Sequence, residues 1–199
     1  MSTPTIVAVV GSLRDESYTR TALKYALATA ERAGAETELL DLREYELPVF
    51  DPDVDAAEQG DAEQLLDVVG RADGVILGSP VYHGSYSGAI RNFHDYCSFD
   101  EYEDTVVGLL ATAGGGSFAS TLDHLRITVR GVHGRVIPHQ VGIRNASDRF
   151  EAAPDAPDGR AFVDDDLRDR VERLGRELVE EASRLDAGSV GRRPASADD

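Results

Sequence analysis

Short apolar runs alternate along the chain with longer stretches in which apolar residues recur every three or four positions. The runs are rich in β-branched residues and mostly lack polar alternation, which predicts strands buried on both faces of a parallel sheet. The longer stretches predict helices that pack one apolar face on that sheet. The predicted strands cover residues 5–10, 36–42, 74–78, 105–112 and 135–143. The predicted helices cover residues 17–33, 62–71, 88–96, 118–132 and 167–185.

Five strands that each precede a helix predict an α/β fold with right-handed crossovers. The expected architecture is a three-layer sandwich: a five-stranded parallel sheet of order 2-1-3-4-5 with helices on both faces. Residues 47–60 and 145–159 carry prolines and acidic residues and predict surface loops. We expect a single domain over residues 1–186 and a disordered tail over 187–199, which has little apolar surface to bury.

The charge balance excludes some partners. Asp and Glu number 37 against 20 Lys and Arg, a net charge of −17, which disfavours binding to nucleic acid or to an anionic membrane. The acidic residues occur throughout the chain, which favours a solvated surface suited to high salt; an acidic docking face for a basic partner remains the alternative. Cys97 is the only cysteine, and no run approaches the roughly 20 apolar residues of a membrane span. With no basic region at the N-terminus, these features predict a cytoplasmic protein.

Three chemically unusual segments follow the first, third and fourth predicted strands: residues 11–20, 80–87 and 113–118. In a sheet of this order, ligands bind outside the carboxyl ends of the strands, where the first and third strands flank the point at which strand order reverses. We therefore expect the three segments to meet at one edge of the sheet and to form a ligand site there.

The first segment, GSLRDESYTR, has the composition of a phosphate site. It leads into a helix N-terminus, where free N–H groups and the helix dipole attract anions. Ser12, Ser17, Tyr18 and Thr19 supply hydroxyls, and Arg14 can add a charged hydrogen bond. The segment matches neither glycine-rich nucleotide motif, and its hydroxyls suit a phosphate monoester. The alternative is that Ser17 or Thr19 merely caps the helix.

The second and third segments suit a flat ring. SPVYHGSYSG offers Pro80 and Tyr82 for packing and backbone N–H groups near His83 for ring heteroatoms. ATAGGGSF brings backbone close to a ligand without side-chain obstruction. A monophosphate site, an aromatic ledge and a glycine wall at one sheet edge together predict a site for flavin mononucleotide (FMN). No residue pattern predicts a metal site.

The segments GSLRDESYTR, GSPVYHGSYSGAIRNFHDY and TAGGGSFASTLDHLR resemble the signature segments of the NAD(P)H-dependent FMN reductase family, which includes quinone, azo-dye and chromate reductases with a flavodoxin-like fold. The resemblance spans about residues 6–143. It implies that Ser12, Arg14, Ser17, Tyr18 and Thr19 surround the FMN phosphate. It also implies that Pro80, Val81, Tyr82, His83, Gly84 and Ser85 border the isoalloxazine ring and that Gly114, Gly115 and Gly116 cover its pyrimidine side.

The resemblance further implies tightly bound FMN, NADPH or NADH as co-substrate, and a homodimer or homotetramer whose interface includes Arg91 and Asp95. Val81 and His83 depart from the glutamate and asparagine that the family often carries there. The implied activity is ping-pong: the nicotinamide reduces the flavin and leaves, and a flavin, quinone or similar small acceptor then takes the electrons. No acid–base residue is required, although His83 is a candidate proton donor. The alternative function is a flavodoxin-type electron carrier without its own NAD(P)H turnover.

Overall fold

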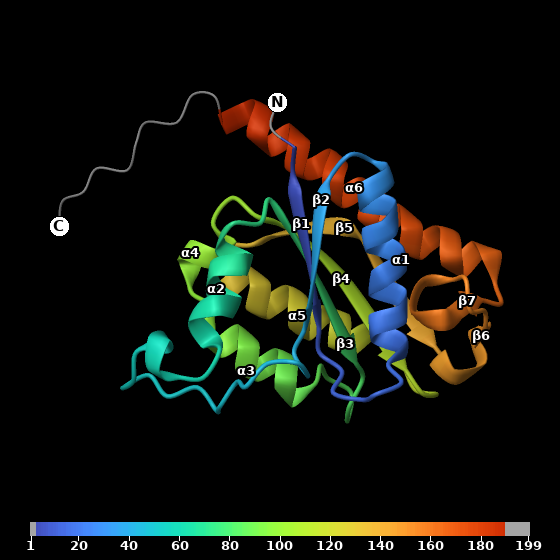
Figure 1. The fold of residues 1–199 in the computed structure, drawn as a ribbon, viewed down its shortest axis with the longest axis horizontal. Helices are drawn as coiled ribbons and strands as arrows, with labels where there is room; N and C mark the ends of the chain where they lie inside the picture. Colours follow the sequence, from blue (N-terminus) through green and yellow to red (C-terminus); the bar gives the residue numbers. More distant parts are fainter. Residues whose placement is uncertain (1–2, 190–199) are drawn as a thin grey trace.

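The computed structural model describes residues 3–189, and its centre is a five-stranded parallel sheet (Figure 1). The strand order is β2-β1-β3-β4-β5, and all neighbours are parallel, as the sequence predicted. Each predicted strand overlaps an observed one. The strands are β1 (Thr5–Val10), β2 (Glu36–Asp41), β3 (Gly74–Pro80), β4 (Val106–Ala113) and β5 (Arg135–Arg144).

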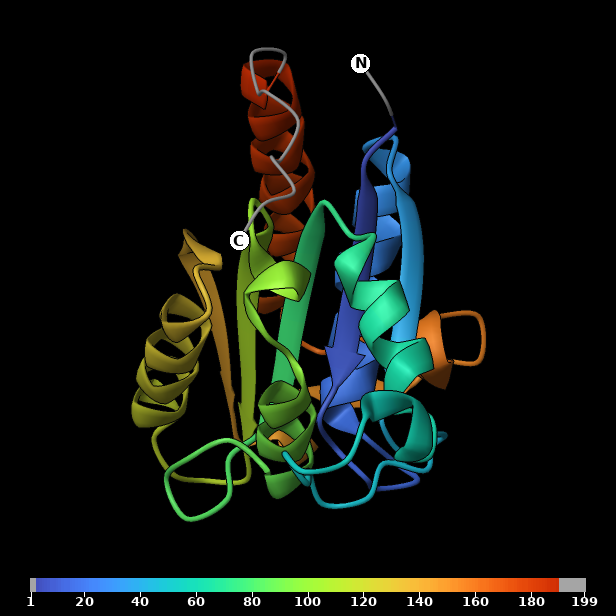
Figure 2. The same ribbon diagram turned by 90° about the vertical axis from the view of Figure 1, so that its left-hand side faces the viewer.

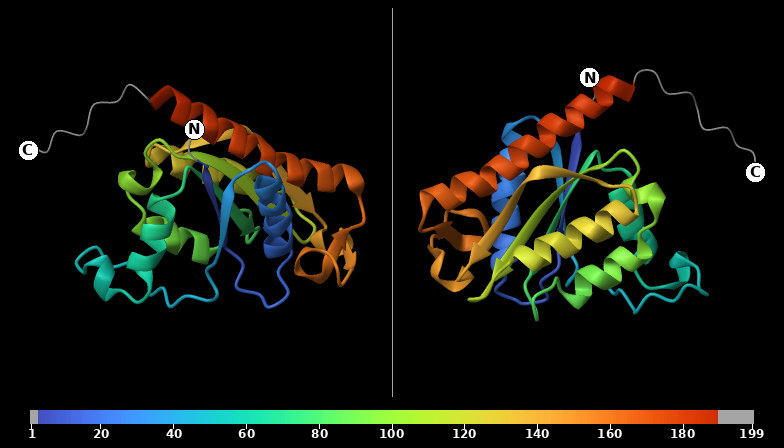
Figure 3. Two further views of the ribbon diagram at one scale, coloured as in Figure 1. Left: turned by 45° about the horizontal axis from the view of Figure 1, so that its top comes forward. Right: turned by 180° about the vertical axis from the view of Figure 1, so that it is seen from behind.

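Helices cover both faces of this sheet, which makes the fold a flavodoxin-like three-layer sandwich (Figures 2 and 3). One face carries α1 (Tyr18–Arg32) and α6 (Asp165–Ser189), which pack against each other. The other face carries α2 (Ala62–Gly70), α3 (Gly88–Tyr96) and α5 (Ala119–Gly131), with the short α4 (Phe99–Tyr102) against α2. No helix among residues 3–189 is long and apolar enough to cross a membrane.

The central strands build two separate cores because successive side chains point to opposite faces. In β1, Ile6, Ala8 and Val10 pack with α1 and α6, whereas Val7 and Val9 pack with the helices of the other face. Every residue of β3 and β4 is buried. Their apolar runs therefore show no alternation in the sequence.

The start of α1 is defined by its cap. The Ser17 hydroxyl accepts a hydrogen bond from the backbone N–H of Arg20 at 3.1 Å, so Ser17 is the N-cap. The backbone N–H groups of Tyr18 and Thr19, in the first turn, have no intrahelical acceptor, as at any helix start. They come directly after the loop that follows β1.

The predicted loop at 145–159 and the residues just after it contain a strand pair that the sequence does not predict. Two three-residue strands, β6 (Phe150–Ala152) and β7 (Arg160–Phe162), pair antiparallel beside the N-terminal half of α1 (Figure 1). The Phe150 ring stacks on Tyr18 with centroids 5.4 Å apart, and the Phe162 ring meets Tyr25 edge-on at 4.9 Å. Strands this short carry no readable alternation, and partners distant in sequence stabilise them.

Helix α6 also runs further than predicted. It extends to Ser189, three residues into the segment for which a disordered tail is predicted. The rest of that predicted tail, 190–199, lies outside the described residues.

The loop at 47–60 is predicted correctly as a loop, and a buried side chain organises it. The Gln59 amide donates to the carbonyls of Asp51 (3.0 Å) and Val54 (2.7 Å). Its oxygen accepts from the Asp51 N–H at 3.0 Å and from the Tyr96 hydroxyl at 2.9 Å. The Gln59 side chain therefore connects the acidic loop to Tyr96 of α3. Gln59 directly follows a short 3₁₀ turn within this loop, η1 (Ala56–Glu58).

One buried histidine makes the fold sensitive to acid. Burial lowers the pKa of His94 on α3, and the charge of Arg91 lowers it further, while Asp95 and a backbone hydrogen bond oppose the shift. Its Nδ1 has no hydrogen-bond partner among the described residues. The unfolded chain then binds more protons than the native state below about pH 6.5, so stability is lost as the pH falls through that value, by up to about 1.4 kcal/mol per pH unit.

We expect His94→Phe to lose less stability than the wild type between about pH 7.5 and about pH 5, because only the wild type must charge this buried ring. Urea unfolding at both values measures the difference, and comparing the two proteins cancels every other titrating group. Equal losses would show that His94 protonates without cost.

Candidate cofactor site

The three loops predicted from sequence meet at the carboxyl edge of the sheet, the lower edge in Figures 1 and 2. The Ser87 hydroxyl donates to the Gly11 carbonyl at 2.6 Å, joining the first loop to the second. The Val81 N–H donates to the Thr112 carbonyl at 2.8 Å, joining the second to the end of β4. The Thr19 and Thr112 hydroxyls lie 2.6 Å apart. The edge is therefore one connected surface.

The first loop offers buried hydroxyls beside a helix N-terminus. Ser12 and Ser17 are 2% and 1% exposed. Ser17 accepts a bond as the N-cap, which leaves its own O–H proton available. Capping and anion binding, posed as alternatives from the sequence, are thus compatible at this residue. Arg14 is exposed, and no residue in the described part of the chain pairs with its guanidinium.

Two predicted phosphate residues have side chains engaged elsewhere. The Thr19 side chain is buried against the sheet, where its hydroxyl meets Thr112. The Tyr18 ring stacks on Phe150. The Arg160 guanidinium also lies over the Tyr18 ring, 5.3 Å from its centroid. At both positions the backbone N–H remains available to an anion.

The second loop is a tight turn. Tyr82 and Ser85 exchange backbone hydrogen bonds of 2.9 and 3.0 Å, while His83 and Gly84 have positive φ angles of 52° and 79°. This pattern is that of a two-residue hairpin turn. The turn decides which of the backbone N–H groups expected near His83 stay free for a ring. Those of Tyr82 and Ser85 are used inside the turn, and the exposed N–H groups of His83 and Gly84 remain.

Two side chains of α5 hold this turn in place. The Ser120 hydroxyl donates to the Gly84 carbonyl at 2.6 Å, and the Ser85 hydroxyl lies 3.0 Å from Nδ1 of His124. Tyr82 keeps 46% of its surface exposed, whereas Pro80 is buried as the last residue of β3. The aromatic ledge is consequently Tyr82 alone, next to the intermediate Val81.

The third loop is open. Gly114, Gly115 and Gly116 are all exposed, and a Cβ at Gly114 or Gly116 would meet nothing within 4 Å. Arg144, at the end of β5, donates from Nε to the Gly115 carbonyl at 3.0 Å and anchors this loop to the neighbouring strand. The predicted glycine wall is therefore a free surface beside the turn.

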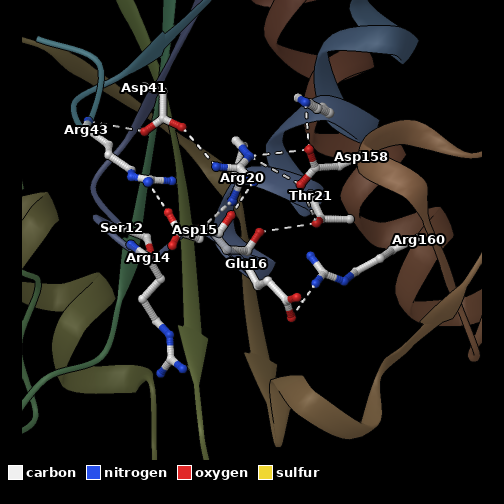
Figure 4. Close-up of polar contacts among 12 residues, drawn as sticks. Ser12, Arg14, Asp15, Glu16, Arg20, Thr21, Asp41, Arg43, Asp158 and Arg160 are labelled. Atoms are coloured by element: carbon white, nitrogen blue, oxygen red, sulfur yellow. Dashed lines mark hydrogen bonds and ion pairs between the residues drawn. The ribbon is translucent and has the colours of Figure 1, made fainter.

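Sequence reasoning missed the group that braces the first loop, Arg20 (Figure 4). Its Nη2 donates to the Asp15 carbonyl at 2.6 Å, Nη1 to Asp41 at 3.2 Å, and Nε to Asp158 at 3.2 Å. Because the peptide is planar and trans, turning the Asp15 carbonyl toward Arg20 aims the Glu16 N–H the opposite way. The arginine therefore sets the orientation of a peptide unit in the first loop.

The carboxylates around Arg20 come from distant parts of the chain. Burial by itself would raise the pKa of Asp158, but hydrogen bonds from Lys24 and Thr21 and the charge of Arg20 leave it lowered. Lys24 reaches the same carboxylate at 2.7 Å. The sequence did hold a signal for this network: Arg20 lies in the first turn of α1, where a cation is unfavourable beside the positive end of the helix dipole unless carboxylates compensate it.

Arginines also hold the acidic side chains of the first loop. Asp15 pairs with Arg43, and Glu16 pairs with Arg160 at 2.9 Å (Figure 4). These pairs offset two negative charges that would otherwise repel an anion in the loop.

Cys97 takes no part in this site. The residue is 7% exposed and its thiol donates to the Phe93 carbonyl at 3.4 Å. Burial raises the pKa of the thiol, which makes it unreactive.

Comparison with known proteins identifies the family of the chain. The family model described as NADPH-dependent FMN reductase matches residues 4–148, the part of the chain that carries all three loops. The chain belongs to this family. A curated relative, the FMN-dependent NADPH-azoreductase of Staphylococcus aureus, is 32% identical over 143 residues, which cover 69% of this chain and 76% of that protein. The cofactor of this FMN reductase family member is FMN, and its electron donor is a reduced nicotinamide.

Solved structures show the same fold at low identity. The flavoenzyme NAD(P)H:(acceptor) oxidoreductase FerB from Paracoccus denitrificans superposes with a TM-score of 0.75 at 21% identity, covering 92% of this chain and 98% of that one. An NADH:FMN oxidoreductase in its apo form gives a TM-score of 0.64 at 22% identity, covering 96% and 92%.

The groups at the sheet edge fit FMN. Free N–H groups at the start of α1 and the buried hydroxyls of Ser12 and Ser17 match a terminal phosphate. The Tyr82 ledge and the open glycine loop match a flat ring with one face accessible.

Proposed function

We propose that this FMN reductase works by a ping-pong mechanism in the cytoplasm, with the nicotinamide and then a flavin, quinone or similar small acceptor using the same open face of the cofactor. Bound FMN supplies the two-electron chemistry. The observation that carries the proposal is the junction of the three loops, in which buried hydroxyls at a helix N-terminus lie beside an exposed turn and a bare glycine segment. An open face of the cofactor would let the nicotinamide leave and a small acceptor bind in the same place.

The residues of the site bind and orient. We propose that Ser12, Arg14 and Ser17, with the N–H groups of Tyr18 and Thr19, hold the phosphate. The N–H groups of His83 and Gly84 would hydrogen-bond at the inner edge of the ring, next to Pro80, Val81, Tyr82 and Ser85. Gly114, Gly115 and Gly116 would border the pyrimidine side, where backbone dipoles stabilise negative charge. The exposed imidazole of His83 is a candidate proton donor to a quinone.

The proposal is tested by purifying the protein with FMN and following NADH and NADPH oxidation with free FMN, a quinone or an azo dye, in low and molar salt. We expect a yellow protein whose double-reciprocal plots at several acceptor concentrations are parallel. Intersecting plots would contradict ping-pong. A yellow protein without turnover in any salt would instead support a flavodoxin-type carrier whose acidic surface docks a protein partner.

Arg14→Ala should weaken FMN binding by about 1.5–3 kcal/mol, because a charged hydrogen bond to the phosphate is lost. Fluorescence titration of the apoprotein measures the affinity. Arg71→Ala is the matched control, since Arg71 is also exposed and bonds only a carbonyl of its own helix, Asp67. Unchanged FMN affinity in Arg14→Ala would place this guanidinium in solvent.

We also propose that the protein forms a homodimer or homotetramer through the groove beside α3. The groove has a volume of about 560 Å³ and is lined by apolar side chains that include Leu13 and Val49, which are 57% and 85% exposed. The ion pair of Arg91 with Asp95 lies at its border. Light scattering should report a multiple of 21.4 kDa, and Val49→Glu should shift it toward the monomer. A monomeric wild type would contradict this assembly.

A further inference from the structure

Three arginines line one pocket at the outer edge of the sheet, beyond β5. The pocket has a volume of about 240 Å³ and lies between the starts of α5 and α6. Arg144 ends β5, Arg149 follows the 3₁₀ turn η2 (Ala146–Asp148), and Arg170 lies in the second turn of α6. Three guanidinium groups thus come from three separate elements to one place.

These guanidinium groups have no carboxylate partner. Within residues 3–189, no ion pair involves Arg144, Arg149 or Arg170. Two carboxylates, Asp164 and Asp166, also line the pocket, and Asp164 caps α6 by accepting from the Leu167 N–H at 3.2 Å. The charged side chains of the pocket therefore sum to about +1, from three cations and two anions, in a chain whose net charge is −17.

Two of the arginines are held in a way that leaves their outer donors free. Arg144 donates from Nε to the Gly115 carbonyl at 3.0 Å, and Arg149 donates from Nε to the Arg144 carbonyl at 3.2 Å. In each case the inner nitrogen is bonded to backbone, and the two terminal amino groups have no partner in the described chain. A guanidinium oriented in this manner can bind an oxyanion with two parallel hydrogen bonds.

The pocket adjoins the open side of the cofactor site. Arg144 contacts Gly115, which belongs to the glycine loop, and Phe118, which closes that loop, forms part of the pocket wall. The Phe118 ring packs directly over Gly142 of β5, where a Cβ would lie 2.0 Å from a ring carbon. A molecule on the open face beside the glycine loop would therefore have an aromatic wall and free guanidinium groups within its immediate surroundings.

We propose that Arg144, Arg149 and Arg170 form an anion subsite that receives a phosphate or sulfonate group of the substrate on the open face. This inference rests on the proposed function. Two sources share that chemistry: the 2′-phosphate that distinguishes NADPH from NADH, and an anionic substituent on the acceptor. The subsite thus makes the enzyme prefer either NADPH over NADH or an anionic acceptor over an uncharged one.

The test compares charged and uncharged partners in the FMN-loaded protein and its Arg149→Gln and Arg170→Gln variants. Calorimetry with redox-inert NADP⁺ and NAD⁺ measures donor binding without turnover. The KM values for benzoquinone sulfonate and benzoquinone, with NADH as donor, measure acceptor preference. Arg130→Gln is the matched control, because Arg130 is exposed on α5, has no ion pair among residues 3–189 and lies outside the pocket.

We expect one of the two preference ratios to fall by about 10- to 100-fold in both variants, because each loses a charged hydrogen bond to the substrate. In Arg130→Gln, both ratios should stay at the wild-type value. A fall in the NADP⁺ to NAD⁺ ratio assigns the subsite to the donor. A fall in the sulfonate to benzoquinone ratio assigns it to the acceptor. Ratios that stay constant, or that change equally in the control, overturn the proposal. A wild type that oxidises neither nicotinamide but binds NADP⁺ through these arginines would overturn the proposed function and leave the anion subsite standing.

Discussion

Replacing Arg20 by glutamine should destabilise the protein by about 3–5 kcal/mol, because removing one partner leaves a buried carboxylate without its counter-charge. The side chain of Asp41 is only 3% exposed, and Arg20 is its cationic partner at 3.2 Å. Asp158 would be affected less, since Lys24 and Thr21 remain beside it. Urea unfolding measures the effect. Arg32→Gln, on the same helix, removes the exposed pair with Glu172 and should cost no more than about 1 kcal/mol.

The same substitution should impair cofactor binding selectively. Without Arg20 the Asp15–Glu16 peptide is no longer held, so we expect FMN affinity to fall by about tenfold or more while riboflavin, which lacks the phosphate, binds as before. Arg20→Gln combined with Asp41→Asn should recover part of the stability, because the unpaired charge is gone, but not the FMN affinity. An equal loss of FMN and riboflavin affinity would mean that Arg20 acts only through overall stability.

Gly175→Ala should destabilise the protein by about 3 kcal/mol, at the upper end of the cost of overpacking. A Cβ at Gly175 on α6 would lie 2.0 Å from the carbonyl oxygen of Ala26 on α1. The obstructing atom is backbone, so the two helices must separate along the core that they share. The expected cost exceeds the gain of about 1 kcal/mol that alanine brings to a helix.

Thermal or urea unfolding measures this cost, with Gly70→Ala as the control. Gly70 is the last residue of α2, and a Cβ there would meet nothing within 4 Å. We expect that control to be neutral or stabilising by up to about 1 kcal/mol. A Gly175→Ala protein as stable as the wild type would show that α1 and α6 can shift apart without cost.

The pattern of apolar residues by itself predicted much of this protein. Because strands buried on both faces must be apolar throughout, the runs at β1, β3 and β4 were readable without any partner. The alternation of strands and helices then implied the parallel order, and the order placed the three unusual loops at one edge. The phosphate loop, the Tyr82 turn and the glycine loop are local in sequence, so their composition pointed to FMN before their geometry was known.

The direction and pairing of individual side chains were decided only by the tertiary structure. The Thr19 hydroxyl turns to Thr112, and the Tyr82 and Ser85 N–H groups close a turn instead of facing a ligand. Arg20 depends on carboxylates at positions 41 and 158, and the strands β6 and β7 depend on rings of α1. Contacts between residues so far apart leave no periodic signal in a single sequence. The sequence alone thus predicted which loops meet at this edge of the sheet, and long-range packing determined which of their groups are free to bind a ligand.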